Sequence, residues 1–166
     1  AAALPGDPVA ILPMDGFHYD DAVLHAMGRW PWKGAPDTFD VGGLKSTLRR
    51  LRDPAEGPVA VPVFDRDLEI SRGSARIIAP GVRLILTEGN YLLLGHDPWQ
   101  SLRTEFDATV MIDVPEEELK RRLGARWIGY GLTEAEIDFK LEGNDLPNGR
   151  LIAAESGAAD YVLGIG

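Results

Sequence analysis

The sequence predicts an α/β fold, with a doubly wound, mainly parallel sheet and flanking helices. Short apolar runs recur along the chain as candidates for buried strands, and stretches of helical periodicity lie between and after them. Strands that alternate with helices are typical of parallel sheets. The 166 residues contain no internal repeat and no interdomain linker, so we expect residues 1–166 to form one domain.

Four apolar runs are the predicted strands of this sheet. They cover residues 9–14, 59–64, 82–87 and 108–114. Residues 70–79, which end in the letters RIIA, are predicted to add a short antiparallel segment to the sheet.

Two stretches have the periodicity of amphipathic helices. Apolar residues recur three or four positions apart at Val41, Leu44, Leu48 and Leu51 in the first stretch, and at Leu119, Leu123 and Trp127 in the second. Pro115 and the three glutamates after it are typical of a first helical turn, because acids are favoured at its positive end. We therefore expect the second helix to begin there.

The composition narrows the classes of function. A net charge of −9 disfavours a nucleic acid as partner, because such binding needs a basic face. No apolar run is long enough to cross a bilayer, and residues 1–6 do not resemble a secretion signal, so we expect a cytoplasmic chain with no membrane partner. The absence of cysteine excludes disulfides, thiolate metal sites and cysteine nucleophiles. Thirteen arginines against four lysines still allow a bound triphosphate.

Acidic, other polar and aromatic residues follow three of the predicted strands at their carboxyl ends, which is where open α/β sheets bind ligands. They are Asp15, Phe17 and His18 after the first strand, Asp65, Arg66 and Asp67 after the second, and Glu88, Asn90 and Tyr91 after the third. One acid in such a place is most often a helix cap or a turn residue. Three acids at one edge can hold hydrated Mg²⁺ or take a proton from a substrate hydroxyl.

Six motifs, taken in order, resemble those of the P-loop kinases related to phosphoribulokinase, uridine kinase and bacterial pantothenate kinase. They are PMDGFHYDD (13–21), KGAPDTFD (33–40), PVFDRDLEISRG (62–73), LILTEGNYLLL (84–94), IDVPEEELKRRLGARW (112–127) and NDLPNGRLI (144–152). The resemblance covers nearly the whole chain and is strongest to the fructokinase-like and nucleoside or nucleotide kinase-like branch. It implies ATP, Mg²⁺ and a small-molecule acceptor as ligands, and a homodimer as one possible assembly.

The resemblance also implies roles for individual residues. Asp15 matches the aspartate that deprotonates the acceptor hydroxyl, and Glu88 matches a Walker B acid beside the magnesium ion and the phosphates. The acceptor contacts that it implies are His18, Asp65, Arg66, Arg72, Asn90 and Tyr91. Two alternatives stay open: the charged residues of the loop after the second strand form an ordinary surface ion pair, or His18 is a packed, hydrogen-bonded residue.

For ATP, the resemblance implies contacts from a helical lid and from the late NDLPN stretch. Arg122 and Arg126 lie four residues apart, and so share one face of the predicted helix. Asn144 lies near the expected place of the nucleotide base. Arg121 belongs more readily to a solvated basic face.

The phosphate loop that such a kinase needs, G-x-x-x-x-G-K-[ST], is missing from the chain. The fragment GGLKST (42–47) does not replace it, because the motif would need glycine where Phe39 and Leu44 stand, and because the leucines mark an ordinary helix. Our hypothesis is that these residues lack a strand, loop and helix of roughly 30 to 40 residues, and that residues 1–6 are the last turn of that helix. We then expect an ATP site open on one side, with Asp15, Glu88, Arg122 and Arg126 facing it, a strand-wide gap between the strands ending at Met14 and Thr87, and no kinase activity from this chain alone.

The predicted function is ATP-dependent transfer of the γ-phosphoryl group to a hydroxyl of a sugar, nucleoside or pantothenate-like acceptor. The alternative is a non-catalytic relative that binds a metabolite or a partner. A Mg²⁺-dependent hydrolase using the same acids lacks an evident arrangement for activating water.

Overall fold

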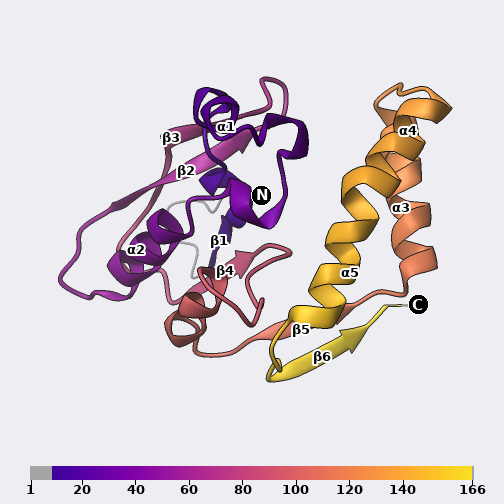
Figure 1. The fold of residues 1–166 in the computed structure, drawn as a ribbon. Helices are drawn as coiled ribbons and strands as arrows, with labels where there is room; N and C mark the ends of the chain where they lie inside the picture. The colour runs from indigo at the N-terminus through magenta and orange to yellow at the C-terminus, as the bar shows by residue number, and fades with distance from the viewer. Residues whose placement is uncertain (1–8, 166) are drawn as a thin grey trace.

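The computed structural model describes residues 9–165, which contain both strands and helices (Figure 1). The elements, in order, are β1 (Val9–Pro13), α1 (Asp21–Ala26), α2 (Val41–Arg52), β2 (Val59–Asp65), β3 (Ile70–Ile78), β4 (Leu84–Glu88), β5 (Val110–Asp113), α3 (Glu116–Gly129), α4 (Glu134–Lys140), α5 (Leu146–Glu155) and β6 (Tyr161–Gly164). Short 3₁₀ turns at Met14–Phe17 and Trp99–Glu105 follow β1 and precede β5. The proposed helical turn at residues 1–6 lies outside the described residues.

The strands form three pairs. β1 runs parallel to β4, β5 runs parallel to β6, and β2 runs antiparallel to β3 with a bulge between Val61 and Val63. The parallel pairs and flanking helices confirm the predicted α/β class. The antiparallel segment predicted at residues 70–79 is β3 of the hairpin. A side-chain hydrogen bond from Arg76 to the carbonyl oxygen of Ile11 ties β3 to β1.

The gap expected beside β1 is wrong, because β1 and β4 are hydrogen-bonded neighbours along their whole length. Within residues 9–165, β4 pairs only with β1 and β5 pairs only with β6. Leu84 and Leu86 of β4 are 50% and 49% exposed, and Val110 and Ile112 of β5 are 50% and 57% exposed. These two strands are therefore not the buried strands that their apolar sequences predict, and among the described residues each of them has one unpaired side.

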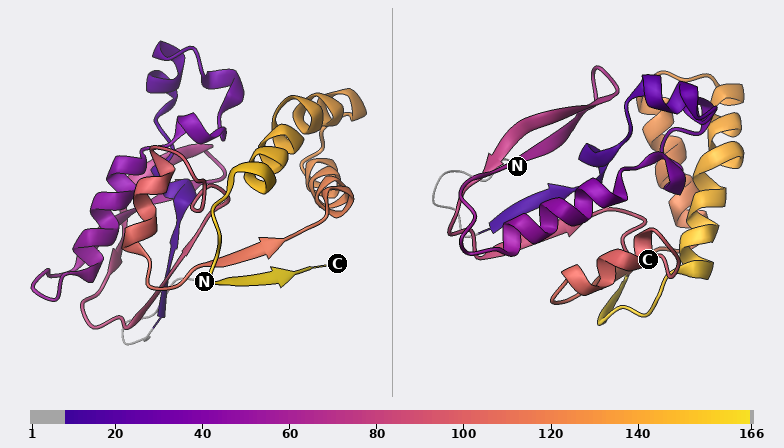
Figure 2. Two further views of the ribbon diagram at one scale, coloured as in Figure 1. Left: turned by 60° about the horizontal axis from the view of Figure 1, so that its bottom comes forward. Right: turned by 60° about the vertical axis from the view of Figure 1, so that its left-hand side comes forward.

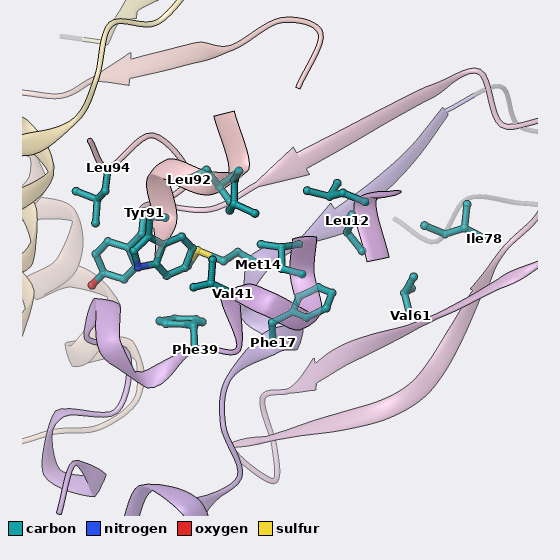
Figure 3. Packing of buried hydrophobic residues seen from close by; sticks show 14 of the residues in the cluster. Leu12, Met14, Phe17, Phe39, Val41, Val61, Ile78, Tyr91, Leu92 and Leu94 are labelled. Carbon is teal, nitrogen blue, oxygen red and sulfur yellow. The ribbon is translucent and has the colours of Figure 1, made fainter. Parts of the chain in front are cut away.

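The core lies between the β1–β4 pair, the β2–β3 hairpin and α2 (Figure 3). Leu12 and Met14, from the end of β1 and the turn after it, are almost fully buried. Beside them Phe39, Tyr91 and Trp99 pack as an aromatic cluster, with ring centroids 5.5–5.8 Å apart. The segments that follow β1 and β4 are therefore anchored in the hydrophobic core.

The GGLKST fragment lies inside α2, as an ordinary helix. The Asp40 side chain accepts a hydrogen bond from the backbone N–H of Gly43 at 2.8 Å and caps the helix. Leu44 and Leu48 point into the core at 0% and 5% exposure. The rejection of this fragment as a phosphate loop is confirmed.

The C-terminal helices form a group of their own. Figure 2 shows α3, α4 and α5 packed together and apart from β1, β4 and α2. Leu119, Leu123 and Trp127 are the half-buried residues of α3 that the periodicity predicts. No helix among residues 9–165 has both the length and the apolar composition needed to cross a membrane.

Candidate active site

The ends of β1 and β4 bring two carboxylates together. Pro13 pairs with Glu88 in the parallel register, and Asp15 follows Pro13 by two residues. Burial raises the pKa of Glu88, and the negative charge of Asp15 raises it further, while the positive charge of Arg66 opposes this effect. The structure thus brings three of the predicted site residues, Asp15, Glu88 and Arg66, within electrostatic reach of one another.

Two glycines allow the segments that carry these acids to pack closely. A Cβ atom on Gly16 would lie 2.8 Å from the carbonyl oxygen of Pro62 in β2, and one on Gly89 would lie 2.5 Å from the Cβ atom of Met14. The Ser71 hydroxyl also donates a hydrogen bond to the carbonyl oxygen of Gly16. Neither glycine is among the predicted site residues, although each directly follows a predicted site acid.

Arg66 extends from the β2–β3 turn to the first of these acids. Its Nη2 atom lies 2.5 Å from Oδ2 of Asp15, and its guanidinium carbon lies 5.2 Å from the centroid of the Phe64 ring. The Arg66 side chain remains 61% exposed, and that of Asp15 is 32% exposed. The Asp15–Arg66 pair therefore forms an accessible charged rim at the end of the sheet.

Asp65 and Arg72, also predicted acceptor contacts, pair with each other across the hairpin at 3.3 Å. Oδ1 of Asp65 further accepts hydrogen bonds from the backbone N–H groups of Asp67 and Leu68, both at 3.2 Å. These contacts shape the turn that presents Arg66. They favour the alternative in which this pair is structural.

His18 is packed between two aromatic rings. The centroids of Phe39 and Phe64 lie 4.0 Å and 4.8 Å from that of the imidazole, and Nδ1 lies 2.8 Å from the carbonyl oxygen of Asp15. Burial lowers the pKa of His18, and the positive charges of Lys33 and Arg66 act in the same direction. Of its two interpretations, this geometry favours the packed, hydrogen-bonded residue.

Lys33, the first residue of the KGAPDTFD motif, belongs to the site although no role was predicted for it. Its ammonium group lies 2.5 Å from Oδ1 of Asp21, hydrogen-bonds the carbonyl oxygen of Glu69 and lies 5.7 Å from the Phe64 ring centroid. The side chain is only 17% exposed. Lys33 therefore links the β2–β3 turn to the start of α1, beside the Asp15–Arg66 pair.

Tyr91 does not line the site surface as predicted. Its side chain is fully buried, and its hydroxyl donates a hydrogen bond of 2.7 Å to the carbonyl oxygen of Gly34. The apolar surroundings raise the pKa of this hydroxyl. The predicted acceptor contact is corrected to a core residue that supports the loop carrying Lys33, whereas the neighbouring Asn90 is exposed.

The predicted ATP contacts lie in the C-terminal helical group and have partners of their own. Arg122 pairs with Glu118 on α3 at 2.6 Å, and the guanidinium carbon of Arg126 lies 4.5 Å from the Trp127 ring centroid. Asn144 accepts a hydrogen bond of 3.0 Å from Asn148. Within residues 9–165, no hydrogen bond or ion pair joins these three residues to Asp15 or Glu88, so the two predicted groups are not directly bonded to each other.

The donor set fits a magnesium ion shared with a phosphate ligand. Residues 9–165 contain no group of three or more histidines or acids that could hold a metal by themselves. Glu88 supplies one carboxylate at the edge of the sheet next to Asp15, and Mg²⁺ commonly takes one or two carboxylates together with substrate phosphates and water.

Known proteins include relatives of this chain. No family model matches the chain. The Escherichia coli protein YggC is 34% identical over 93% of the chain, which spans 63% of YggC. A candidate uridine kinase of Schizosaccharomyces pombe is 29% identical over 93% of the chain, which spans 68% of that protein.

A solved structure extends the comparison to three dimensions. The crystal structure of a candidate fructose transport system kinase from Silicibacter sp. TM1040 superposes with a TM-score of 0.88 and 37% identity, covering 95% of this chain and 76% of that one. The motifs, the α/β fold and these relatives agree, and the chain belongs to the P-loop kinases related to uridine kinase, pantothenate kinase and phosphoribulokinase.

Proposed function

We propose that the protein is an ATP-dependent small-molecule kinase that phosphorylates a hydroxyl group of a sugar, nucleoside or pantothenate-like acceptor. The observation that carries the proposal is the convergence of Asp15 and Glu88 at the paired ends of β1 and β4, in a chain of the P-loop kinase family. In phosphoryl transfer, catalysis consists mainly of positioning and charge neutralisation, and an acid next to the acceptor supplies the base.

In the proposed reaction, Asp15 accepts the proton of the acceptor hydroxyl as that oxygen bonds to the γ-phosphorus of ATP. The bond from the γ-phosphorus to the β–γ bridging oxygen breaks, ADP leaves with the bonding electrons, and Asp15 later returns its proton to water. Glu88 would hold Mg²⁺, which supplies neutralisation of the phosphate charge. Arg122, Arg126 and Asn144 remain proposed ATP contacts.

We also propose that the loop that cradles the phosphates belongs to a segment outside these 166 residues and adds to the unpaired side of β4. The support is the missing G-x-x-x-x-G-K-[ST] motif together with the half-exposed Leu84 and Leu86 on that strand. ATP and Mg²⁺ titrated into this 166-residue chain should show weak binding at best by calorimetry and no measurable turnover. Micromolar binding with turnover would mean that another segment cradles the phosphates.

The proposed base is tested in the full-length protein by Asp15→Asn, with ATP, Mg²⁺ and a panel of hydroxylated acceptors. Turnover should fall by about two to four orders of magnitude, while nucleotide binding is kept, because the loss of a general base has effects of this size. The matched control is Asp107→Asn, since Asp107 is also an aspartate paired with an arginine, Arg52, at 2.8 Å. Near-normal turnover in Asp15→Asn would remove this residue from the mechanism.

The alternative, a relative that binds its ligand without catalysis, makes a different prediction. Its wild-type form would bind an acceptor of the panel and show no ATP-dependent product with any of them, and Asp15→Asn would then change only binding.

A further inference from the structure

We infer that the acceptor carries an anionic group, a carboxylate or a phosphate, which binds Arg66 and draws it away from Asp15. The inference rests on the proposed function and specifies the class of acceptor. It starts from a conflict within the site: the residue proposed as base is occupied by a cation.

Asp15 is held by Arg66 through a charge-assisted hydrogen bond. The guanidinium nitrogen lies 2.5 Å from Oδ2, and the two residues come from different elements, the turn after β1 and the turn between β2 and β3. A base must lie within hydrogen-bond reach of the hydroxyl whose proton it takes. As long as Arg66 keeps its position, it competes with the acceptor hydroxyl for this carboxylate.

The other cations around the site are already engaged. The Lys33 ammonium group is mostly buried between the Asp21 carboxylate and the Glu69 carbonyl group, and Arg72 pairs with Asp65 inside the hairpin. Among residues 9–165, Asp15 is the only ion-pair partner that Arg66 has. Arg66 is therefore the cation of this rim that is best placed to change partners.

Arg66 also has the exposure and the shape for an exchange of partners. Its side chain is 61% exposed, and the guanidinium group rests over the Phe64 ring, so the group can turn at the mouth of the site without losing that support. A guanidinium group offers five N–H donors in a planar fork, which matches both carboxylate and phosphate oxygens.

The charge of the acceptor decides whether the exchange takes place. A neutral hydroxyl or amide group makes a weaker hydrogen bond to guanidinium than a carboxylate does, so it cannot displace Asp15. An anionic group on the acceptor replaces one charged partner of Arg66 with another, and leaves both carboxylate oxygens of Asp15 free for the hydroxyl. Binding of the correct acceptor would thus release the base at the moment it is needed.

The test measures binding, independently of turnover. Gluconate, glucose 6-phosphate and the neutral parent glucose are titrated by calorimetry into the full-length protein and into Arg66→Gln, Arg66→Lys and Arg50→Gln. Arg50 is the matched control, because it is an exposed arginine paired with an acid, Glu56, at 2.7 Å. It precedes β2, whereas Arg66 follows β2. The carboxyl ¹³C resonance of Asp15, assigned with Asp15→Asn, reports on its release.

At least one of the two anions should bind wild type about tenfold or more tightly than glucose, the order expected for one charge-assisted hydrogen bond. It should also shift the Asp15 resonance, whereas glucose should not. Arg66→Gln should abolish both the preference and the shift, Arg66→Lys should keep part of the preference, and Arg50→Gln should behave as wild type. Equal binding of glucose and both anions, or a preference that survives in Arg66→Gln, would overturn the inference.

A kinase assay on the same ligands separates this inference from the proposed function. Phosphorylation of glucose with no dependence on Arg66 would support the kinase and overturn the anionic acceptor. Anion binding through Arg66, with no ATP-dependent product from any acceptor, would support the anion site and refute the kinase.

Discussion

Substituting Gly89 by alanine tests whether the two acid-bearing segments approach one another as the structure shows. The added Cβ atom would lie 2.5 Å from Cβ of Met14, about 0.9 Å closer than the 3.4 Å at which ordinary contact begins. Met14 is 1% exposed and its Cβ atom is fixed to the backbone, so the clash cannot be relieved by turning a flexible side chain. Overpacking of this kind costs roughly 1–3 kcal/mol.

The assay is thermal unfolding followed by circular dichroism. For a chain of this size, the midpoint should fall by roughly 2–12 °C, since 1 kcal/mol corresponds to about 2–4 °C. Gly73→Ala is the control, because nothing lies within 4 Å of the Cβ atom it would add. If Gly89→Ala and Gly73→Ala unfold at the same temperature, the segments after β1 and β4 are not in close contact and the proposed geometry of Asp15 and Glu88 is wrong.

Two further predictions concern residues around the site. Because burial holds the pKa of His18 below 6.5, the unfolded chain binds more protons than the folded one at mildly acidic pH. The free energy of unfolding, measured in urea, should therefore fall as the pH is lowered through about 6.5, and His18→Phe should reduce this fall. An unchanged pH profile would exclude His18 as its source. Tyr91→Phe removes the buried hydrogen bond to Gly34 and should cost about 1 kcal/mol in the same assay. No loss of stability would show that the hydroxyl does not support the loop.

The sequence was sufficient to predict the class of fold and the main elements. The apolar runs locate β1, β2, β4 and β5 to within a few residues, because short, almost wholly apolar segments have few other places in a folded chain. The order of the strands could not be predicted from the sequence. Pairing of β1 with β4 is a long-range contact that leaves no local trace, so the sequence pattern wrongly predicts a gap between these two strands.

Some elements were missed for identifiable reasons. β6 is exposed along its whole length and is defined by its pairing with β5, so no burial pattern marks it. Pro147 and Gly149 are poor helix formers, so the start of α5 does not look helical in the sequence, although proline is tolerated in a first helical turn. α4, in contrast, begins with a capping box from Thr133 to Glu136 that the sequence does display.

The sequence likewise predicts one part of the candidate site and not the other. The meeting of Asp15 and Glu88 follows from parallel strands ending at one edge, which a sequence pattern can predict. The burial of Tyr91 and the link formed by Lys33 depend on side-chain packing between segments far apart in the chain, which periodicity does not report.

The unpaired sides of β4 and β5 bear on how these residues behave in a concentrated solution. Among the residues that the structure describes, each offers a row of backbone groups without a strand partner, together with half-exposed leucine, valine or isoleucine, and such an edge is a template for a second copy of the chain. Neither β4 nor β5 contains a proline or a lysine that would block such pairing. Preparations of the 166 residues alone should therefore scatter more light as their concentration rises, whereas a longer chain that covers β4 should remain clear.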